Sequence, residues 1–163
     1  MTTNQTQPAT ILVVDDDLPI VNLCKAFLEE AGFTVLGTNG SSEALKICMQ
    51  HKGPIDLLLT DLVLPPPGFQ IASASNQFPH VNGLELAVRA TGIRSELRII
   101  LMSGNPDKEL AGHGIKRGTL PFLAKPFDRD RLLALVKNVL AQPATPLGVE
   151  NPARAANDTE WFG

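Results

Sequence analysis

Short apolar runs alternate with longer stretches of helical periodicity between residue 10 and about residue 141. The apolar runs predict strands, and they cover residues 11–14, 33–36, 55–60, 98–103 and 120–124. The helical stretches cover residues 18–31, 41–50, 83–91, 106–116 and 128–140, with glycines at many of the boundaries. Runs that are apolar on both faces are typical of parallel strands covered by helices. The five alternating β-α units therefore predict an α/β fold with a doubly wound, mostly parallel sheet and right-handed crossovers.

The first and last predicted helices each carry an apolar stripe at the 3, 4 spacing of a buried helix face. The stripe of the first helix consists of Ile20, Leu23, Cys24 and Phe27. The stripe of the last helix consists of Leu132, Leu133, Val136 and Leu140. These residues are expected to face the sheet, whereas Leu18 and Val21 lie off the stripe and are expected to be exposed.

Three segments of the chain do not follow this alternation. Residues 66–81 form a long connection after the third strand, and loops of that length are uncommon and often functional. Residues 142–163 are rich in Pro, Ala and Asn without periodicity, which predicts a disordered tail that ends in the unusual pair Trp161-Phe162. Residues 1–9 are polar and are expected to form a disordered lead before a single domain at residues 10–141.

Composition is that of an ordinary soluble domain. The 163 residues are 44% hydrophobic and 19% charged, and the formal charge of −3 without a long Lys/Arg cluster argues against nucleic-acid binding. No apolar stretch reaches the ~20 residues of a membrane span, and residues 1–9 lack a signal core, so a cytoplasmic location is expected. Cys24 and Cys48 fall in apolar helix positions and are expected to be reduced core residues.

Carboxylates follow two of the predicted strands. Asp15 and Asp16 come after the first strand and Asp61 after the third, and ligands bind at the carboxyl ends of strands in open parallel sheets. At ~4 Å and an effective dielectric constant of about 20, one like-charge pair costs roughly 4 kcal/mol. A divalent cation relieves that repulsion, and an all-oxygen ligand set favours Mg²⁺. The alternative from these residues alone is that the acids start a helix, with Pro19 in its first turn.

Two further strand ends carry polar side chains, because Ser103 ends the fourth predicted strand and Lys125 follows the fifth. Carboxylates, a hydroxyl and an ammonium at one sheet edge can receive and hold a phosphoryl group. Taken alone, Ser103 could be an ordinary strand-end hydroxyl and Lys125 a solvated surface charge. The four strand ends together favour a phosphoryl site.

With these strand ends in this order, the chain resembles the receiver domain of two-component response regulators, in its single-domain, chemotaxis-regulator-like form. The matching strings are ILVVDDD, DLLLTDLVLP, IILMSG and FLAKPF, and the match spans about residues 10–141 except for 66–81. The resemblance implies a flavodoxin-like fold, with a five-stranded sheet of order 2-1-3-4-5 and a site at its switch point.

The resemblance also implies roles for the acids. Asp61 would be the phosphoacceptor, receiving a phosphoryl group from a phosphohistidine of a sensor histidine kinase or histidine phosphotransfer protein. Asp16 and Asp61 would ligate Mg²⁺ directly, Asp15 would hold a metal-bound water, and Val63 would offer its backbone carbonyl.

Three more residues receive roles in the same way. Ser103 would be the switch hydroxyl and Lys125 the phosphate-binding cation, with a cis peptide bond into Pro126. Phe122 occupies the position of the switch aromatic.

The chain departs from the family pattern beside the phosphoacceptor. The glycine that opens the third helix usually stands 8 positions after that residue, whereas Gly83 stands 22 positions after Asp61, which implies 14 inserted residues. Our hypothesis is that the insertion covers the site and alters partner choice or phosphoryl lifetime. The alternative is a tolerated surface excursion.

The function expected is therefore a phosphorylation-switched signalling protein that is not itself an enzyme and changes its contacts with a downstream protein. A second hypothesis is a receiver-like interaction module that is not phosphorylated. A third is a Mg²⁺-dependent phosphatase, which needs an acid two positions after the nucleophile, where this chain has Val63.

Overall fold

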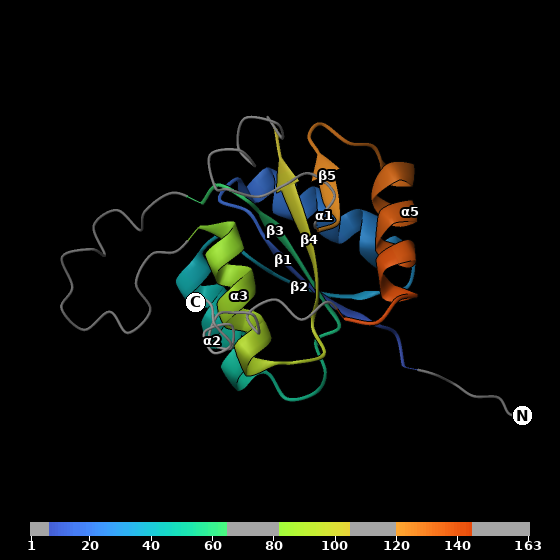
Figure 1. The fold of residues 1–163 in the computed structure, drawn as a ribbon. Coiled ribbons are helices and arrows are strands. Elements are labelled where there is room, and N and C mark those ends of the chain that lie inside the picture. The colour runs from blue at the N-terminus through green and yellow to red at the C-terminus, as the bar shows by residue number, and fades with distance from the viewer. Residues whose placement is uncertain (1–6, 65–81, 105–119, 145–163) are drawn as a thin grey trace, which may run out of the picture.

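The computed structural model describes residues 7–64, 82–104 and 120–144 of the chain, and they form one five-stranded parallel sheet flanked by helices (Figure 1). The strands stand in the order β2-β1-β3-β4-β5. This confirms the predicted α/β class and strand order. The predicted loop 66–81, the predicted helix 106–116 and most of the predicted lead and tail lie outside the described residues.

The strands and helices begin and end close to the predicted positions. The strands are β1 Thr10–Val14, β2 Thr34–Thr38, β3 Leu57–Asp61, β4 Arg98–Ser103 and β5 Phe122–Ala124. The helices are α1 Leu18–Glu30, α2 Ser41–Gln50, α3 Gly83–Ile93 and α5 Arg129–Leu140. All four neighbouring strand pairs are parallel, so every strand ends at the same edge of the sheet.

The sheet separates two apolar layers. Alternate residues of the strands, such as Ile11 and Leu57, pack with α1 and α5 on one face. The residues between them, such as Leu12 and Leu58, pack with α2 and α3 on the other face. Figure 1 shows this arrangement, with α5 and α1 on one side of the strands and α2 and α3 on the other. Burial on both faces is why the strands are continuous apolar runs.

The buried stripe of α1 is not the predicted one. Val21, Cys24 and Leu28 are buried, whereas Leu23 is exposed, and Ile20 and Phe27 are only partly buried. Val21 packs over Gly37 of β2, where a Cβ would lie 2.8 Å from Val21 Cγ1. The glycine therefore makes room for Val21 and fixes the rotation of the helix, which corrects the expectation that Val21 is exposed.

The stripe of α5 is largely as predicted. Leu132, Leu133 and Val136 are buried, but Val139 completes the buried face in place of Leu140, which is partly buried. Cys24 and Cys48 are both free and buried, as expected from their apolar helix positions.

The start of α3 is held against the end of β3. The Gly83 amide donates to the Leu62 carbonyl at 2.8 Å, and a Cβ on Gly83 would overlap the carbonyl oxygen of Asp61. Asn82 caps the helix by accepting a hydrogen bond from the Glu85 amide at 2.8 Å. The helix therefore begins directly beside the strand end, although 21 residues separate Asp61 from Gly83.

Two residues just outside the predicted domain limits also bond to it. The Ala9 carbonyl accepts from the Thr34 amide at 2.9 Å, and the Gln142 carbonyl accepts from Arg98 Nε at 2.6 Å. Both chain ends of the described region are therefore attached at the amino edge of the sheet.

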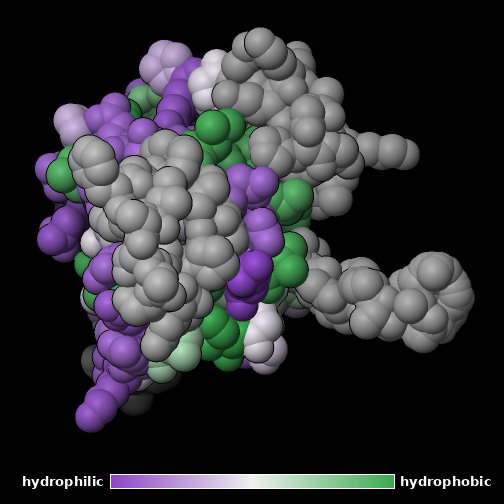
Figure 2. Space-filling model, turned by 90° about the vertical axis from the view of Figure 1, so that its left-hand side faces the viewer, coloured by the Kyte–Doolittle hydropathy of each residue, from purple (hydrophilic) through white to green (hydrophobic). Residues whose placement is uncertain are grey.

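Figure 2 views the molecule from the side of α2 and α3, where hydrophobic and hydrophilic side chains alternate over the surface that is not grey. Met49, Val88 and Ile93 are exposed apolar residues of these two helices. None of the helices within the described ranges has the length and apolar character needed to cross a membrane.

Candidate functional site

Polar side chains gather at the carboxyl edge of the sheet. Asp15 follows the last residue of β1, Asp61 ends β3, Ser103 ends β4 and Lys125 follows β5. Asp15 and Ser103 are fully buried, and Asp61 is buried with 7% of its surface exposed. The structure thus brings together residues that lie up to 110 positions apart in the sequence.

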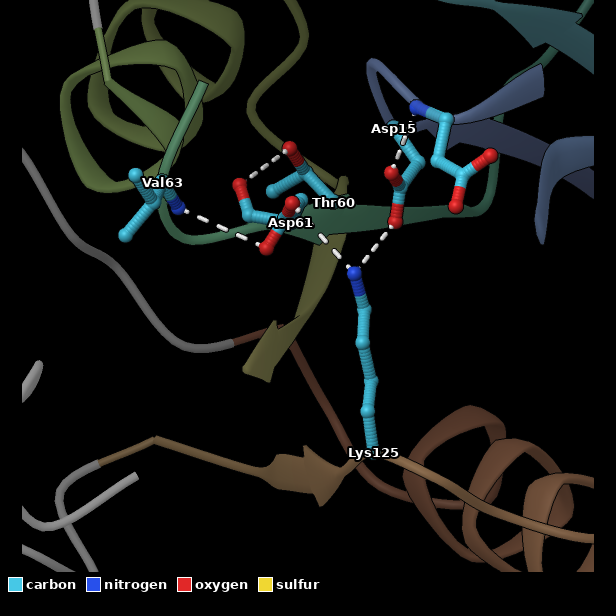
Figure 3. A network of polar contacts seen from close by, with 6 residues as sticks. Asp15, Thr60, Asp61, Val63 and Lys125 are labelled. Carbon is cyan, nitrogen blue, oxygen red and sulfur yellow. Dashed lines mark hydrogen bonds and ion pairs between the residues drawn. The ribbon is translucent and has the colours of Figure 1, made fainter. Parts of the chain in front are cut away.

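Lys125 joins the two buried carboxylates (Figure 3). Its Nζ lies 2.7 Å from Asp15 Oδ2 and 3.3 Å from Asp61 Oδ2. The Lys125 amide also donates to the Ser103 carbonyl at 2.8 Å, which fixes the backbone from which this side chain extends. Charge-assisted bonds of this kind are the strong ones in a poorly solvated setting, so the ammonium has a defined position between the two acids.

The electrostatics of the site disfavour charge on Asp61. Burial, together with the negative charge of Asp15, raises the pKa of Asp61 to about 6, and the Lys125 ammonium only partly offsets this. Burial alone would lower the pKa of Lys125, but its hydrogen bonds and ion pairs with Asp15 and Asp61 outweigh burial and raise that pKa. The carboxylates therefore carry more negative charge than one lysine compensates.

The loop after β1 combines a helix start with the carboxylate cluster. Asp17 occupies the N-cap position of α1, yet its side chain makes no capping hydrogen bond. Instead, Asp15 Oδ1 accepts a hydrogen bond from the Asp17 amide at 2.9 Å, while Asp15 Oδ2 faces Lys125. The alternative that these acids only start a helix therefore does not account for Asp15.

Asp15, Asp16 and Asp61 can converge on one ion. One carboxylate oxygen from each lies within 4.8 Å of the other two, and Asp16 is the exposed member. Three carboxylates at one point, with access from solvent beside Asp16, form the hard oxygen set that suits Mg²⁺. Val63 donates its amide to Asp61 Oδ1 at 3.5 Å, which places it beside the cluster.

Phe122 and Pro126 lie on either side of Lys125 in the chain. Phe122 is half-buried at the start of β5, opposite Leu101 of β4. The peptide bond between Lys125 and Pro126 is cis, the geometry that the resemblance implies.

Three residues that lie around the site, Thr60, Gly83 and Cys24, were not predicted to take part in it. Thr60, fully buried, donates from Oγ1 to the Asp61 carbonyl at 3.0 Å, and Gly83 contacts that same carbonyl. Cys24 lies close enough that burial first, and then the charge of Asp15, raises the pKa of its thiol to about 12. The signals for Thr60 were its polarity inside an apolar run and its position next to Asp61.

A model of the family described as "Response regulator receiver domain" matches residues 11–137 of the chain. The DNA-binding transcriptional regulator NtrC of Azospirillum brasilense is 32% identical over 150 residues, which are 92% of this chain and 28% of NtrC. The transcriptional regulatory protein FixJ of Bradyrhizobium diazoefficiens is 29% identical over 132 residues, which are 81% of this chain and 57% of FixJ. The chain thus spans about a quarter to about a half of the length of these curated relatives.

Solved structures show the same similarity. The chain superposes on a response regulator receiver domain protein from Clostridium thermocellum with a TM-score of 0.64 and 26% identity, covering 82% of this chain and 94% of that one. The match extends over nearly the whole of a receiver domain, so the described fold and the aligned sequence point to one family.

Proposed function

Because the chain belongs to the family of response regulator receiver domains, we propose that it accepts a phosphoryl group on Asp61 and thereby switches its contacts with other proteins. The observation that carries the proposal is that Lys125 Nζ lies within 3.3 Å of a carboxylate oxygen of both Asp15 and Asp61 at the carboxyl edge of the sheet. Asp16 lies beside them. This set offers a nucleophile, a cation and a metal-binding group at one place.

The transfer step uses a carboxylate oxygen of Asp61 as the nucleophile. This oxygen forms a bond to phosphorus while the P–N bond of a phosphohistidine breaks, and the nitrogen keeps that electron pair. The imidazole leaves as a neutral ring when its other nitrogen carries a proton. Asp61 must be ionised to attack, and a pKa of about 6 leaves it mostly ionised at neutral pH.

Asp15, Asp16 and Asp61, with the Val63 carbonyl, would hold the Mg²⁺ of this reaction. Bound there, the ion would offset the negative charge of the carboxylates and of the phosphoryl oxygens. The carboxylate oxygens fit a hard divalent cation in type and spacing, since all three lie within 4.8 Å of one another.

Lys125 and Ser103 would respond to the new charge. An aspartyl phosphate brings about two negative charges, so the Lys125 ammonium, already 3.3 Å from Asp61, can transfer its contact to a phosphoryl oxygen. Ser103 would donate its hydroxyl to the same group, and Phe122, on the strand beside β4, would repack in response. Moving a two-state equilibrium from 1:99 to 99:1 requires about 5.5 kcal/mol, which several charge-assisted bonds can provide.

The partners follow from the family. Receiver domains of response regulators are phosphorylated by histidine kinases, so a sensor kinase or a histidine phosphotransfer protein in the cytoplasm is the proposed donor. Since the chain spans only part of NtrC and FixJ, the DNA binding named for NtrC belongs to that protein, and the downstream partner proposed here is a protein.

The test is incubation with Mg²⁺ and a small phosphodonor such as acetyl phosphate, read by intact mass. One phosphoryl adduct is expected on the native chain and none on Asp61→Asn. Asp130→Asn, an exposed aspartate in the first turn of α5, is the matched control and should be modified like the native chain.

Two results would contradict the proposal. An adduct that survives in Asp61→Asn would move the phosphoacceptor elsewhere. A native chain that stays unmodified with Mg²⁺ and donor in excess would favour the receiver-like module that is not phosphorylated.

A further inference from the structure

A groove runs between β5 and α5, on the outer side of the last strand. It has a volume of about 720 Å³ and is lined by Phe122 and Ala124 from β5 and by Arg131, Ala134, Leu135 and Asn138 from α5. Cavities of this size hold a drug-sized ligand or a few side chains. The groove is largely apolar, and in the sheet formed by the described residues β5 is the edge strand, with no strand on its outer side.

The chain itself contains a matching apolar pair. Trp161 and Phe162 follow a polar stretch, residues 150–160, in which alanine and proline are the only apolar residues. Trp161 is the only tryptophan of the protein. Two adjacent aromatic side chains are the kind of anchor that fills an apolar groove, because each buries a large area with few rotatable bonds.

The segment that carries this pair leaves the domain beside the groove. Gln142 is held by Arg98 and by Asn138, and Asn138 itself lines the groove. The lining residues of α5 extend back over about two turns, or roughly 12 Å at 1.5 Å per residue. Gln142 and Trp161 are 19 positions apart, and a chain of that many residues can extend to about 60 Å at ~3.3 Å per residue. The pair can therefore reach every part of the groove.

Charge favours the same contact. Glu160 directly precedes Trp161, Asp158 stands three positions before it, and Arg131 lines the groove. Within residues 7–64, 82–104 and 120–144, the Arg131 guanidinium forms no ion pair, so it is available to an incoming carboxylate. Asp130 also lines the groove and repels an acid, and among the described lining residues Arg131 is the one that carries a positive charge.

We propose that Trp161 and Phe162 bind in the groove between β5 and α5 of the same molecule. Because the aromatic pair and the groove belong to one chain, the effective concentration of the pair at the groove is in the millimolar range, so an anchor with millimolar intrinsic affinity is already about half bound. A bound segment covers Phe122 and Ala124, next to Lys125 in the chain. The segment around Trp161 then acts as an autoinhibitory strap that a protein partner must displace from this face.

The fluorescence of Trp161 tests the contact directly, because the chain has no other tryptophan and no tyrosine. In the native chain, acrylamide quenching is expected to be about twofold weaker than in an Ala134→Glu variant, with emission at shorter wavelength. Ala134 is exposed on α5, so this change places a charge in the groove without entering the core. Ala26→Glu, an exposed alanine on α1, is the matched control and should quench like the native chain.

Circular dichroism and urea unfolding establish that both variants fold like the native chain. Equal quenching in the native chain and in Ala134→Glu would overturn the proposal. Quenching that depends on protein concentration over a hundredfold range would overturn it too, since the strap would then lie on a second copy. The measurement needs neither Mg²⁺ nor a phosphodonor, so its failure is separate from a failure of phosphorylation at Asp61.

Discussion

Replacing Asp61 by asparagine is expected to stabilise the metal-free protein, although it removes the proposed phosphoacceptor. The carboxylate is almost fully buried near Asp15, and for these reasons its pKa is raised from 3.8 to about 6. A shift of about 2 pKa units corresponds to about 3 kcal/mol against the ionised form. Asparagine keeps the shape of the side chain without the charge, so it avoids this penalty.

The stability gain of Asp61→Asn is expected to depend on pH. The folded state holds the Asp61 proton more tightly than the unfolded state does, so its contribution to stability is complete below pH 3.8. That contribution is lost as the pH rises through about 6. The gain of Asp61→Asn over the native chain should therefore be close to zero at pH 4 and reach about 2–3 kcal/mol at pH 7.

Urea unfolding with EDTA, followed at several pH values, measures this difference. Asp16→Asn is the matched control, because Asp16 is exposed and the raised pKa of Asp61 comes from burial and from Asp15; the gain of this variant should stay below about 0.5 kcal/mol. A variant at Asp61 that is no more stable than the native chain at pH 7 would refute the reasoning. So would a gain of equal size at pH 4 and pH 7.

Three further substitutions, two of which have a matched control variant, test other contacts by the midpoint of urea unfolding. Lys125→Met should destabilise the chain by about 3 kcal/mol, because it leaves two buried carboxylates without their cation; a loss below about 1 kcal/mol would contradict the assigned pairing. Gly83→Ala should destabilise by about 1–3 kcal/mol, since its Cβ would overlap the Asp61 carbonyl. Gly92→Ala, within the same helix and with open space around it, should instead stabilise by about 0.5–1 kcal/mol. Arg94→Ala should destabilise by about 2 kcal/mol, because it removes three hydrogen bonds to carbonyls at the end of α2. Its control, Arg89→Ala, removes one exposed ion pair on α3 and should change stability by less than about 0.5 kcal/mol.

The fold was predictable because its signals are local. Each strand is an apolar run bounded by polar or turn residues, and a parallel sheet places all the strand ends at one edge. Asp61, Ser103 and Lys125 could therefore be assigned to one site from their positions after the runs alone.

Details that depend on packing between elements were not predictable. In α1 the two overlapping sets, one with Val21 and one with Leu23, both have the 3, 4 spacing. The choice between them is made by Gly37, which lies on a different element and admits Val21. The bond from Lys125 to Asp15 also needs the folded sheet, since no sequence spacing relates residues 110 positions apart.

The close contact of Gly83 with the end of β3 has a consequence for the evolution and engineering of this chain. Leu62 is tied on one side to Met102 and on the other to Gly83, each by a backbone bond of 2.8 Å, and Leu64 is buried. The described chain is thus held in place on both sides of residues 65–81, at Leu62 next to Asp61 and at Gly83. Because these backbone bonds join residues on either side of 65–81, we expect a sequence exchanged there to leave Asp61, Lys125 and α3 in their places. Residues 65–81 are therefore a position at which a new sequence can change binding specificity.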